Sequence, residues 1–217
     1  MNILELFAGS RSIGKEAERQ GHKVFSVDWT NYDNIDLVID IGKLKLSDVP
    51  FIPDMVWASP DCTTYSIAAI SHHRDGVLPK TDYAKKCDEV NKHMHNLIKE
   101  WLKINANLKY YIENPRGMMN KMNFVSHCQV ATVWYCKYGD MRAKPTHIFT
   151  NNLRTLFNPN GWQPREQCFN GNTNCHHESA PRGSISGTQG KKGSYERSKI
   201  PQQLCEEIIK NVYKCNN

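Results

Sequence analysis

One cysteine stands where an enzyme would place a nucleophile. Cys62 follows a short apolar run, Met55 to Ala58, through the turn Ser59-Pro60-Asp61. In open α/β folds the active site lies just beyond the carboxyl ends of the strands, so a thiol here is positioned for chemistry. Such a thiol attacks an electrophile when its surroundings favour the thiolate. A cysteine is more often a small buried hydrophobe, so the inference depends on position rather than on residue type.

A carboxylate occupies an equivalent position further along the chain. Leu108 to Ile112 is predicted to form a strand, and Glu113-Asn114-Pro115 follows it. Glu113 could hold or protonate a ring nitrogen while a thiolate attacks the ring. The alternative is that Glu113 only terminates the strand.

A third motif combines a glycine turn with two acids. Residues 5–10 predict a strand that runs into a turn at Phe7-Ala8-Gly9-Ser10. Asp28 ends the next strand about 20 residues later, a spacing that suits hydrogen bonds to a ribose. Asp40 lies near the end of a third strand on the same edge of the sheet. Ordinary turn residues would give the same pattern, so this motif alone is weak.

These residues require an α/β sheet that brings strand ends together. Short apolar runs alternate with helical periodicity, which predicts a parallel sheet with right-handed crossovers, a Rossmann-like architecture. The segment 63–82 is rich in Thr, Ser, His and Gly and is predicted to be a mobile loop. Strands are expected at 2–7, 23–28, 37–41, 55–58, 108–112 and 129–135, and helices at 12–20, 83–104 and 200–213.

Composition limits the class of protein. The 217 residues suffice for one domain with its own core, and no apolar stretch is long enough to span a bilayer. The N-terminus has no signal-peptide pattern, which favours the cytoplasm, where the eight cysteines would be thiols or metal ligands rather than disulfides. The formal charge of +6 falls entirely in residues 141–217, with 11 Lys+Arg against 5 Asp+Glu. That asymmetry suggests nucleic acid as a partner, although a solvated basic surface fits equally well.

In their order along the chain, the three motifs resemble those of the DNA cytosine-C5 methyltransferase family, most closely the small methylases of phages. The resemblance implies a class I S-adenosylmethionine-dependent methyltransferase fold, with S-adenosylmethionine as cofactor and DNA as substrate. Arg197-Ser198-Lys199-Ile200-Pro201 resembles the late family motif that completes the cofactor pocket. The cofactor-binding residues implied in this way are Phe7, Ala8, Gly9, Ser10, Asp28, Trp29, Asp40, Ile41, Ser59, Pro60 and Ser198.

The resemblance also implies a mechanism. Cys62 would add to C6 of cytosine while Glu113 stabilises protonation at N3, and C5 would then accept the methyl group. Tyr138-Gly139 is similar to the start of the family's arginine motif, so Arg142 and Lys144 compete for contact with the base. The base must be flipped out or single-stranded. His72, His73 and Arg74 could then form a lid over it, although the two histidines could equally be solvated loop residues.

The chain departs from the family pattern at two places. Asp61 replaces the usual proline before the cysteine, and Arg11-Ser12 stands where a second glycine is common. Two other functions therefore stay open. One is an amino-methyltransferase acting on N4 of cytosine or N6 of adenine, and the other is an inactive DNA-binding relative. Cys62 argues against the first, because transfer to an exocyclic amine needs no thiol.

The chain divides into a catalytic core at 1–150, a target-recognition insertion at 151–195 and a returning helix at 196–217, and a monomer is the simplest expectation. Cys168, Cys175 and His176 lie in the insertion and suggest a structural zinc site, which Cys136 could join. Free thiols and surface histidines are the alternative. Phosphate contacts are expected from Arg154, Arg165, Arg182, Lys191 and Lys192.

Overall fold

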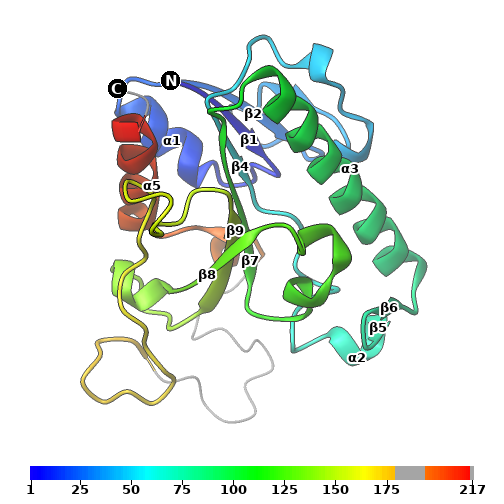
Figure 1. Cartoon of the computed structure of the whole chain (residues 1–217). Coiled ribbons are helices and arrows are strands. Elements are labelled where there is room, and N and C mark those ends of the chain that lie inside the picture. The colour runs from blue at the N-terminus through cyan, green and yellow to red at the C-terminus, as the bar shows by residue number, and fades with distance from the viewer. Residues whose placement is uncertain (179–193, 216–217) are drawn as a thin grey trace.

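A seven-stranded sheet forms the centre of the computed structural model, which describes residues 1–178 and 194–215 (Figure 1). The strand order is β3-β2-β1-β4-β7-β9-β8, and β9 runs antiparallel between β7 and β8. The remaining neighbours pair in parallel, as the sequence predicted for its first half. The strands are β1 (Asn2–Leu6), β2 (Lys23–Asp28), β3 (Leu37–Val38), β4 (Met55–Ala58), β7 (Lys109–Pro115), β8 (Gln129–Trp134) and β9 (Pro145–Thr150).

Helices cover both faces of this sheet, so its central strands β1 and β4 are almost entirely buried. Figure 1 shows α1 (Ser12–Arg19) and α5 (Gln202–Cys215) on one face and α3 (Asp82–Ile104) on the other. Trp57 and Ile208 belong to the core under α1 and α5, whereas Met94 and Trp101 belong to the core under α3. All four residues of β4 are buried, as expected for a parallel strand between two helical layers. The α/β fold predicted from the sequence is therefore confirmed.

The predicted bounds hold for β2 and β4, and β9 is the strand that the sequence prediction missed. β3 is shorter than predicted, because the Asp40 side chain accepts a hydrogen bond from the Gly42 amide (3.0 Å) and starts a 3-10 turn at Ile41–Lys43. β9 pairs with β7 in the register Glu113↔Ile148. It starts at a proline, which lacks the amide that a ladder needs and is tolerated at the first residue of a strand.

The segment predicted as an unstructured loop, 63–82, contains regular structure, so that prediction was wrong in part. It holds the short helix α2 (Ile70–His73) and a hairpin of β5 (Arg74–Asp75) and β6 (Leu78–Pro79). Residues 151–178 are irregular, as predicted, with isolated bridges at Leu153↔Trp162 and Arg142↔Glu178. Short helix α4 (Ser194–Ser198) precedes α5. Within the described chain no helix is long and apolar enough to cross a membrane.

Candidate active site

The turn that carries Cys62 is built by hydrogen bonds from its neighbours. Asp61 accepts a bond from the Thr63 amide (2.6 Å) and another from the Tyr83 hydroxyl of α3. The Cys62 carbonyl accepts from the amides of Tyr65 and Ser66, at 3.0 and 2.8 Å, so the chain coils directly after the thiol. Asp61, the departure from the family pattern, is therefore a structural part of the turn and anchors it to α3.

The same turn is joined to the end of β7. The Asn114 side chain donates to the Pro60 carbonyl (3.0 Å), and the Met118 amide donates to the Tyr65 carbonyl (2.8 Å). A Cβ atom on Gly117 would lie 2.3 Å from the Tyr65 carbonyl oxygen, a distance that real contacts do not reach. Glycine is required there because two backbones touch. The cysteine turn and the strand end that carries Glu113 thus form one unit.

A buried ion pair fixes the segment that follows Cys62. The Arg74 guanidinium binds both carboxylate oxygens of Asp88 on α3, at 2.6 and 3.1 Å, and donates to the Thr64 carbonyl (2.8 Å). The Tyr65 hydroxyl donates to the same carboxylate (2.7 Å). Arg74 is 2% exposed, so the prediction of a mobile lid residue there was wrong. We refer to Thr64, Tyr65, Arg74 and Asp88 as the arginine latch.

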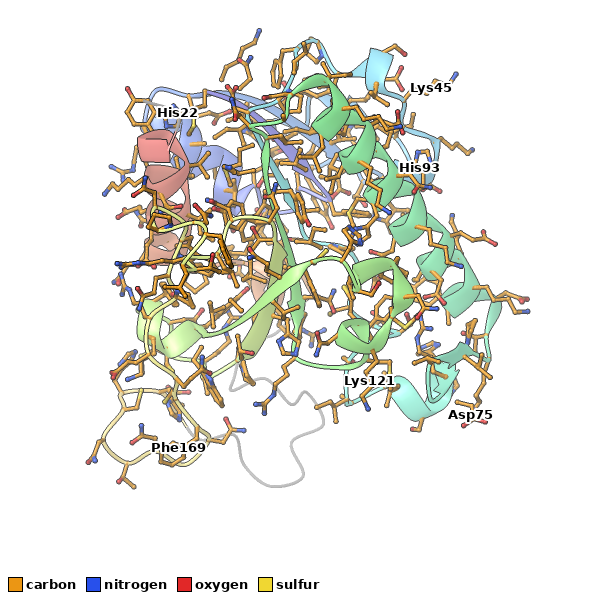
Figure 2. All side chains as sticks on the ribbon, viewed as in Figure 1. His22, Lys45, Asp75, His93, Lys121 and Phe169 are labelled. Atoms are coloured by element: carbon orange, nitrogen blue, oxygen red, sulfur yellow. The ribbon has the colours of Figure 1, made fainter. Side chains whose placement is uncertain are left out.

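The two histidines of the predicted lid sit differently from Arg74. His72 is exposed, and His73 is half-buried with its Nδ1 3.1 Å from the Thr81 hydroxyl. Both lie on α2, and Figure 2 shows Asp75 of the adjoining hairpin at the outer edge of the molecule. The solvated alternative stated for these histidines fits this placement better than contact with a base.

Glu113 is held by two side chains on one of its oxygens. It is 5% exposed, and its Oε1 accepts a hydrogen bond from the Tyr135 hydroxyl (2.9 Å) and an ion pair from Lys144 (3.5 Å). The Lys144 ammonium also lies 4.5 Å from the centre of the Tyr135 ring. Among the described residues Oε2 has no such partner. The carboxylate is therefore oriented by the protein through one oxygen, with the other available to a ligand.

Of the two basic residues in competition for this site, the structure brings Lys144 to Glu113 and places Arg142 elsewhere. Arg142 is 1% exposed and binds the Asp140 carboxylate through Nε and Nη2. It also donates to the carbonyls of Arg197 and Lys199, both at 3.0 Å. These bonds tie the late motif to the turn after β8, so contact between Arg142 and a base would require them to break.

The charges around Cys62 oppose its ionisation in the free protein. Burial raises the pKa of the Cys62 thiol to about 11, and the negative charge of Glu113 adds to the rise. The positive charge of Lys144 lowers the pKa, but by less. With this pKa the thiol is protonated at neutral pH. Removal of the negative charge of Glu113 would lower the pKa of Cys62 and so favour the thiolate. Loss of the negative charge at this carboxylate is thus coupled physically to activation of the nucleophile.

Beside the cysteine turn, a hollow with a volume of about 120 Å³ opens at the carboxyl ends of the parallel strands. This is where open α/β sheets bind their ligands. Its walls are formed by Phe7, Trp29, Asp40, Ile41, Pro60, Asp61, Tyr83, Lys86, Cys87, Val90 and Asn91. Five of the predicted cofactor residues, Phe7, Trp29, Asp40, Ile41 and Pro60, are therefore brought together in one place.

Two acids predicted to bind the cofactor have different positions. Asp28 is 4% exposed, and its carboxylate accepts bonds from the amides of Gly9 (2.9 Å) and Thr30 (2.8 Å). It shapes the glycine turn and is not among the residues that line the hollow. Asp40 does line it and pairs with Lys86 of α3 at 3.0 Å, which together with the Gly42 amide lowers the pKa of Asp40.

Helix α3 contributes site residues that the sequence prediction missed. Tyr83, Lys86, Cys87, Val90 and Asn91 all line the hollow, and they recur at helical spacing along one face. The Oδ1 atom of Asn91 is buried without a hydrogen-bond partner, whereas its Nδ2 donates to the Cys87 carbonyl (2.8 Å). A buried acceptor without a donor at the edge of a hollow is a feature that a ligand would satisfy. The spacing of Tyr83, Lys86 and Asn91 places three polar side chains on one face of α3. This pattern in the sequence could have revealed the face that lines the hollow.

Buried polar side chains, among them Arg11, stabilise the glycine turn from below. Gly9 and Arg11 both have positive φ, 48° and 54°. The Arg11 side chain, which is 4% exposed, donates to the Ser26 hydroxyl (2.9 Å) and pairs with Glu18. Burial raises the pKa of Glu5 beneath it to about 7, although hydrogen bonds from Gly14 and Ser26 oppose the rise. The second departure from the family pattern, at Arg11, is therefore accommodated by buried polar contacts.

The late motif returns to the glycine turn, as the resemblance implied. The Ile200 amide donates to the Ser12 hydroxyl (3.1 Å), and Ser12 lies 2.9 Å from the Ser10 hydroxyl. The Ser198 hydroxyl is 4.0 Å from the position of a Cβ on Gly9. Ser10 and Ser198 thus stand beside the glycine turn, although neither lines the hollow.

The predicted metal ligands do gather, with one change. The ligand atoms of Cys136, Cys168, Cys175 and His177 all lie within 4.8 Å of one another. His176, which the sequence suggested, is exposed and points its Nε2 to the Asp140 carbonyl (3.1 Å), so that assignment is corrected to His177.

The predicted phosphate-binding residues are only partly open to a ligand. Arg165 is bound to Glu207 (2.9 Å) and to the Lys137 carbonyl (2.8 Å), whereas Arg154 contacts Gln163 on the exposed surface. The predicted contacts Arg182, Lys191 and Lys192 lie outside the described residues.

Comparison with known proteins gives one relative along nearly the whole chain. It is named Probable DNA (cytosine-5)-methyltransferase, from Frog virus 3 (isolate Goorha), and is 27% identical over 220 residues, which take in 96% of this chain and 99% of that protein. No protein-family model matches the chain.

Among solved structures, the methyltransferase EhMeth of Entamoeba histolytica superposes with a TM-score of 0.52 at 14% identity, over 77% of this chain and 57% of that one. DNMT2 of Spodoptera frugiperda gives a TM-score of 0.49 at 16% identity, over 76% and 53%. The chain spans about half the length of these solved structures. The chain therefore has the fold of the class I S-adenosylmethionine-dependent methyltransferases, and over nearly its whole length its sequence is similar to a protein named Probable DNA (cytosine-5)-methyltransferase.

Proposed function

We propose that this protein transfers a methyl group from S-adenosylmethionine to C5 of cytosine in DNA, with Cys62 as nucleophile. The observation that carries the proposal is the direct connection between the Cys62 turn and the end of β7, made by Asn114 and by the close approach at Gly117. This connection keeps a thiol and a carboxylate in one unit beside the hollow at the strand ends. The viral relative supports the choice of DNA and of C5.

The hollow suits S-adenosylmethionine by its chemistry. Its wall includes the exposed ring of Trp29, the carboxylate of Asp40 and the unpartnered Oδ1 of Asn91, which offer a stacking surface and two acceptors. S-adenosylmethionine, when bound, supplies the methyl group on an electrophilic sulfonium. The glycine turn, shaped by Asp28, would form the floor, and Ser10, Ser59 and Ser198 would complete the rim as the resemblance implies.

The residues of the chain divide the work on the base. The Cys62 thiol gives up its proton as Glu113 takes one up, the thiolate forms a bond to C6 of cytosine, and Glu113 passes its proton to N3 so that the ring accepts the added electrons. Lys144 and Tyr135 keep Glu113 oriented through Oε1. After C5 has gained the methyl group, with S-adenosylhomocysteine as the leaving group, the C5 proton passes to water and the bond from Cys62 to C6 breaks. N3 then returns its proton to Glu113, and the free thiolate is restored.

DNA would enter from the side of the basic C-terminal third. We propose the 151–195 segment as the recognition insertion between a 1–150 core and the returning 196–217 segment. A monomer working in a reducing cytoplasm completes the proposal. It also includes a structural zinc ion, with a ligand set that differs from the predicted one.

Nucleoside mass spectrometry tests the reaction. DNA incubated with S-adenosylmethionine and the protein should gain 5-methylcytosine, and Cys62→Ser should abolish the gain. Cys128→Ser, a change at a half-buried thiol away from the site, is the matched control and should retain it. N4-methylcytosine or N6-methyladenine, unaffected by Cys62→Ser, would assign the amino-methyltransferase function instead. No product, with DNA binding intact, would identify a DNA-binding relative that has lost catalysis.

A further inference from the structure

Four potential metal ligands meet between the end of β8 and residues 163–178. These residues belong to the proposed recognition insertion, and we call them the recognition segment. Cys136 lies in the turn after β8 (Tyr135–Tyr138), whereas Cys168, Cys175 and His177 come from the irregular segment that follows β9. Cys136, Cys168 and His177 are 2%, 6% and 7% exposed, and Cys175 is half-buried. Residues more than 30 positions apart in sequence therefore converge on one point.

The spacing of the ligand atoms suits a tetrahedral zinc ion. Zn–S bonds of about 2.3 Å place the ligand atoms of such a site roughly 3.8 Å apart. The Cys168 sulfur lies 3.8 Å from Nδ1 of His177, and all four ligand atoms lie within 4.8 Å of one another. The three cysteines are free thiols rather than disulfide partners. Three thiols and one imidazole form a ligand set typical of structural zinc.

A second contact points to a thiolate in this cluster. The Asn172 side-chain amide donates to the Cys168 sulfur at 3.5 Å. Amide donors around a ligating sulfur are the outer contacts that orient and stabilise a metal-bound thiolate. Asn172 lies in the turn between Cys168 and Cys175, where the Cys175 amide donates to the Asn172 carbonyl (3.1 Å).

The segment around these ligands has polar contacts with the core at its start, such as the bond from Arg165 to Glu207, but few apolar contacts. Among the described residues, its apolar cluster at this end consists of Trp134, Cys136, Ala143, Cys168 and Cys175 and is far smaller than the two main cores. Phe169 is 61% exposed and stands at the outer end of the segment, as Figure 2 shows. Small irregular segments without a core of their own require a crosslink or a metal to stay folded.

We infer that Cys136, Cys168, Cys175 and Nδ1 of His177 bind a structural zinc ion, which fastens the recognition segment to the reaction residues. The neighbours of the ligands support this second part. Cys136 follows Tyr135, which binds Glu113, and His177 follows His176, which binds the Asp140 carbonyl. The metal site stands on geometry alone, whereas its role in DNA binding rests on the proposed function.

Metal analysis of the purified full-length chain tests the site. Inductively coupled plasma mass spectrometry should find one zinc per chain in protein prepared without an affinity tag or chelator. Cys175→Ser and His177→Ala should each reduce the content severalfold. His176→Ala is the matched control, because it alters only the adjacent histidine, and it should keep the zinc. Absence of metal, iron in place of zinc, or equal loss in His176→Ala would overturn the assignment.

The role of the ion needs a separate readout. Binding of S-adenosylmethionine, measured by calorimetry, should be unchanged in Cys175→Ser, since the hollow is formed by other elements; this shows that the core has folded. Binding of a fluorescent cytosine-containing duplex should weaken at least tenfold in the same variant. Unchanged DNA binding in a zinc-free variant would overturn the fastening role. Zinc in a protein that methylates no DNA would leave the site standing and refute the proposed function.

Discussion

Two segments outside the central sheet flank the site, and they are stabilised by different chemistry. Residues 59–82, on the nucleophile side, are held by the arginine latch and by backbone contact with β7. Residues 163–178, on the recognition side, are held by turns and by the cysteine–histidine cluster. Asp75 and Phe169 mark the outer ends of the two segments on opposite sides in Figure 2.

The two segments differ in whether their stabilising groups belong to the chain or include an ion taken from solution. Arg74 and Asp88 both belong to the chain, so the nucleophile segment needs no ion from solution once the protein has folded. The recognition segment depends, by our inference, on a metal ion. We therefore expect the geometry around Cys62 to survive conditions that release the recognition segment.

The largest effect should come from breaking the arginine latch. Asp88→Ala leaves the Arg74 guanidinium buried without its partner, and such a loss costs about 3–5 kcal/mol. Thermal unfolding should begin roughly 6–20 °C lower, at 2–4 °C per kcal/mol for a domain of this size, and methyl transfer should be lost. Asp82→Ala, which breaks a surface ion pair six residues earlier on α3, is the control and should leave the unfolding temperature nearly unchanged, because exposed ion pairs are screened by solvent. Equal effects of the two variants would show that the latch adds no stability.

An intermediate effect should follow metal removal. A zinc chelator should open residues 163–178 to limited proteolysis while residues 59–82 stay protected, because the latch contains no metal ligand. Peptide mapping by mass spectrometry locates the cuts, and added zinc should restore protection. Cleavage that starts in both segments at once would contradict the separation between them.

The smallest effect should be a change in the reactivity of the Cys62 thiol. Burial and the charge of Glu113 raise the pKa of the thiol, and Lys144 lowers it. Glu113→Gln should therefore lower the pKa and speed alkylation of Cys62 by iodoacetamide at pH 8, whereas Lys144→Met should slow it. Each change should be about 2- to 10-fold, since one pKa unit changes the thiolate fraction tenfold below the pKa. For the unaltered protein the rate should keep rising with pH toward about 11.

The rates are measured by mass spectrometry of the peptide that contains Cys62. Glu113→Gln should also reduce methyl transfer, so its two effects have opposite signs. Slower alkylation in Glu113→Gln would mean that the carboxylate does not act on the thiol through its charge.

Much of the fold could be predicted because its signals are local. The apolar runs in the sequence predicted the bounds of β2 and β4. The predicted strand ends then pointed to Cys62 and Glu113 as candidate site residues. β9 was missed because its sequence, Pro145–Thr150, has no clear apolar run. It forms a strand because it pairs with β7 and β8 on its two sides. Arg74 was misassigned because nothing in a loop sequence reveals a partner 14 residues away on a helix.

The choice between close neighbours was also beyond the sequence. Arg142 and Lys144 are two residues apart, and only the backbone path decides that Lys144 reaches Glu113 while Arg142 binds Asp140. His176 and His177 differ in the same way, because adjacent side chains point in different directions. Sequence reasoning therefore selected both pairs but could not tell which member contacts Glu113 or joins the cysteine cluster.

The short hairpin between β8 and β9 has a consequence for how this protein can change over generations. Within ten residues it carries Tyr135 and Lys144, which touch Glu113, Cys136 of the metal cluster, and Asp140 and Arg142, which hold the late motif. A single substitution there would be pleiotropic, altering reaction, recognition and cofactor closure together. Natural variation in target preference is thus expected to accumulate in the recognition segment beyond β9, while this hairpin stays under the strongest purifying selection.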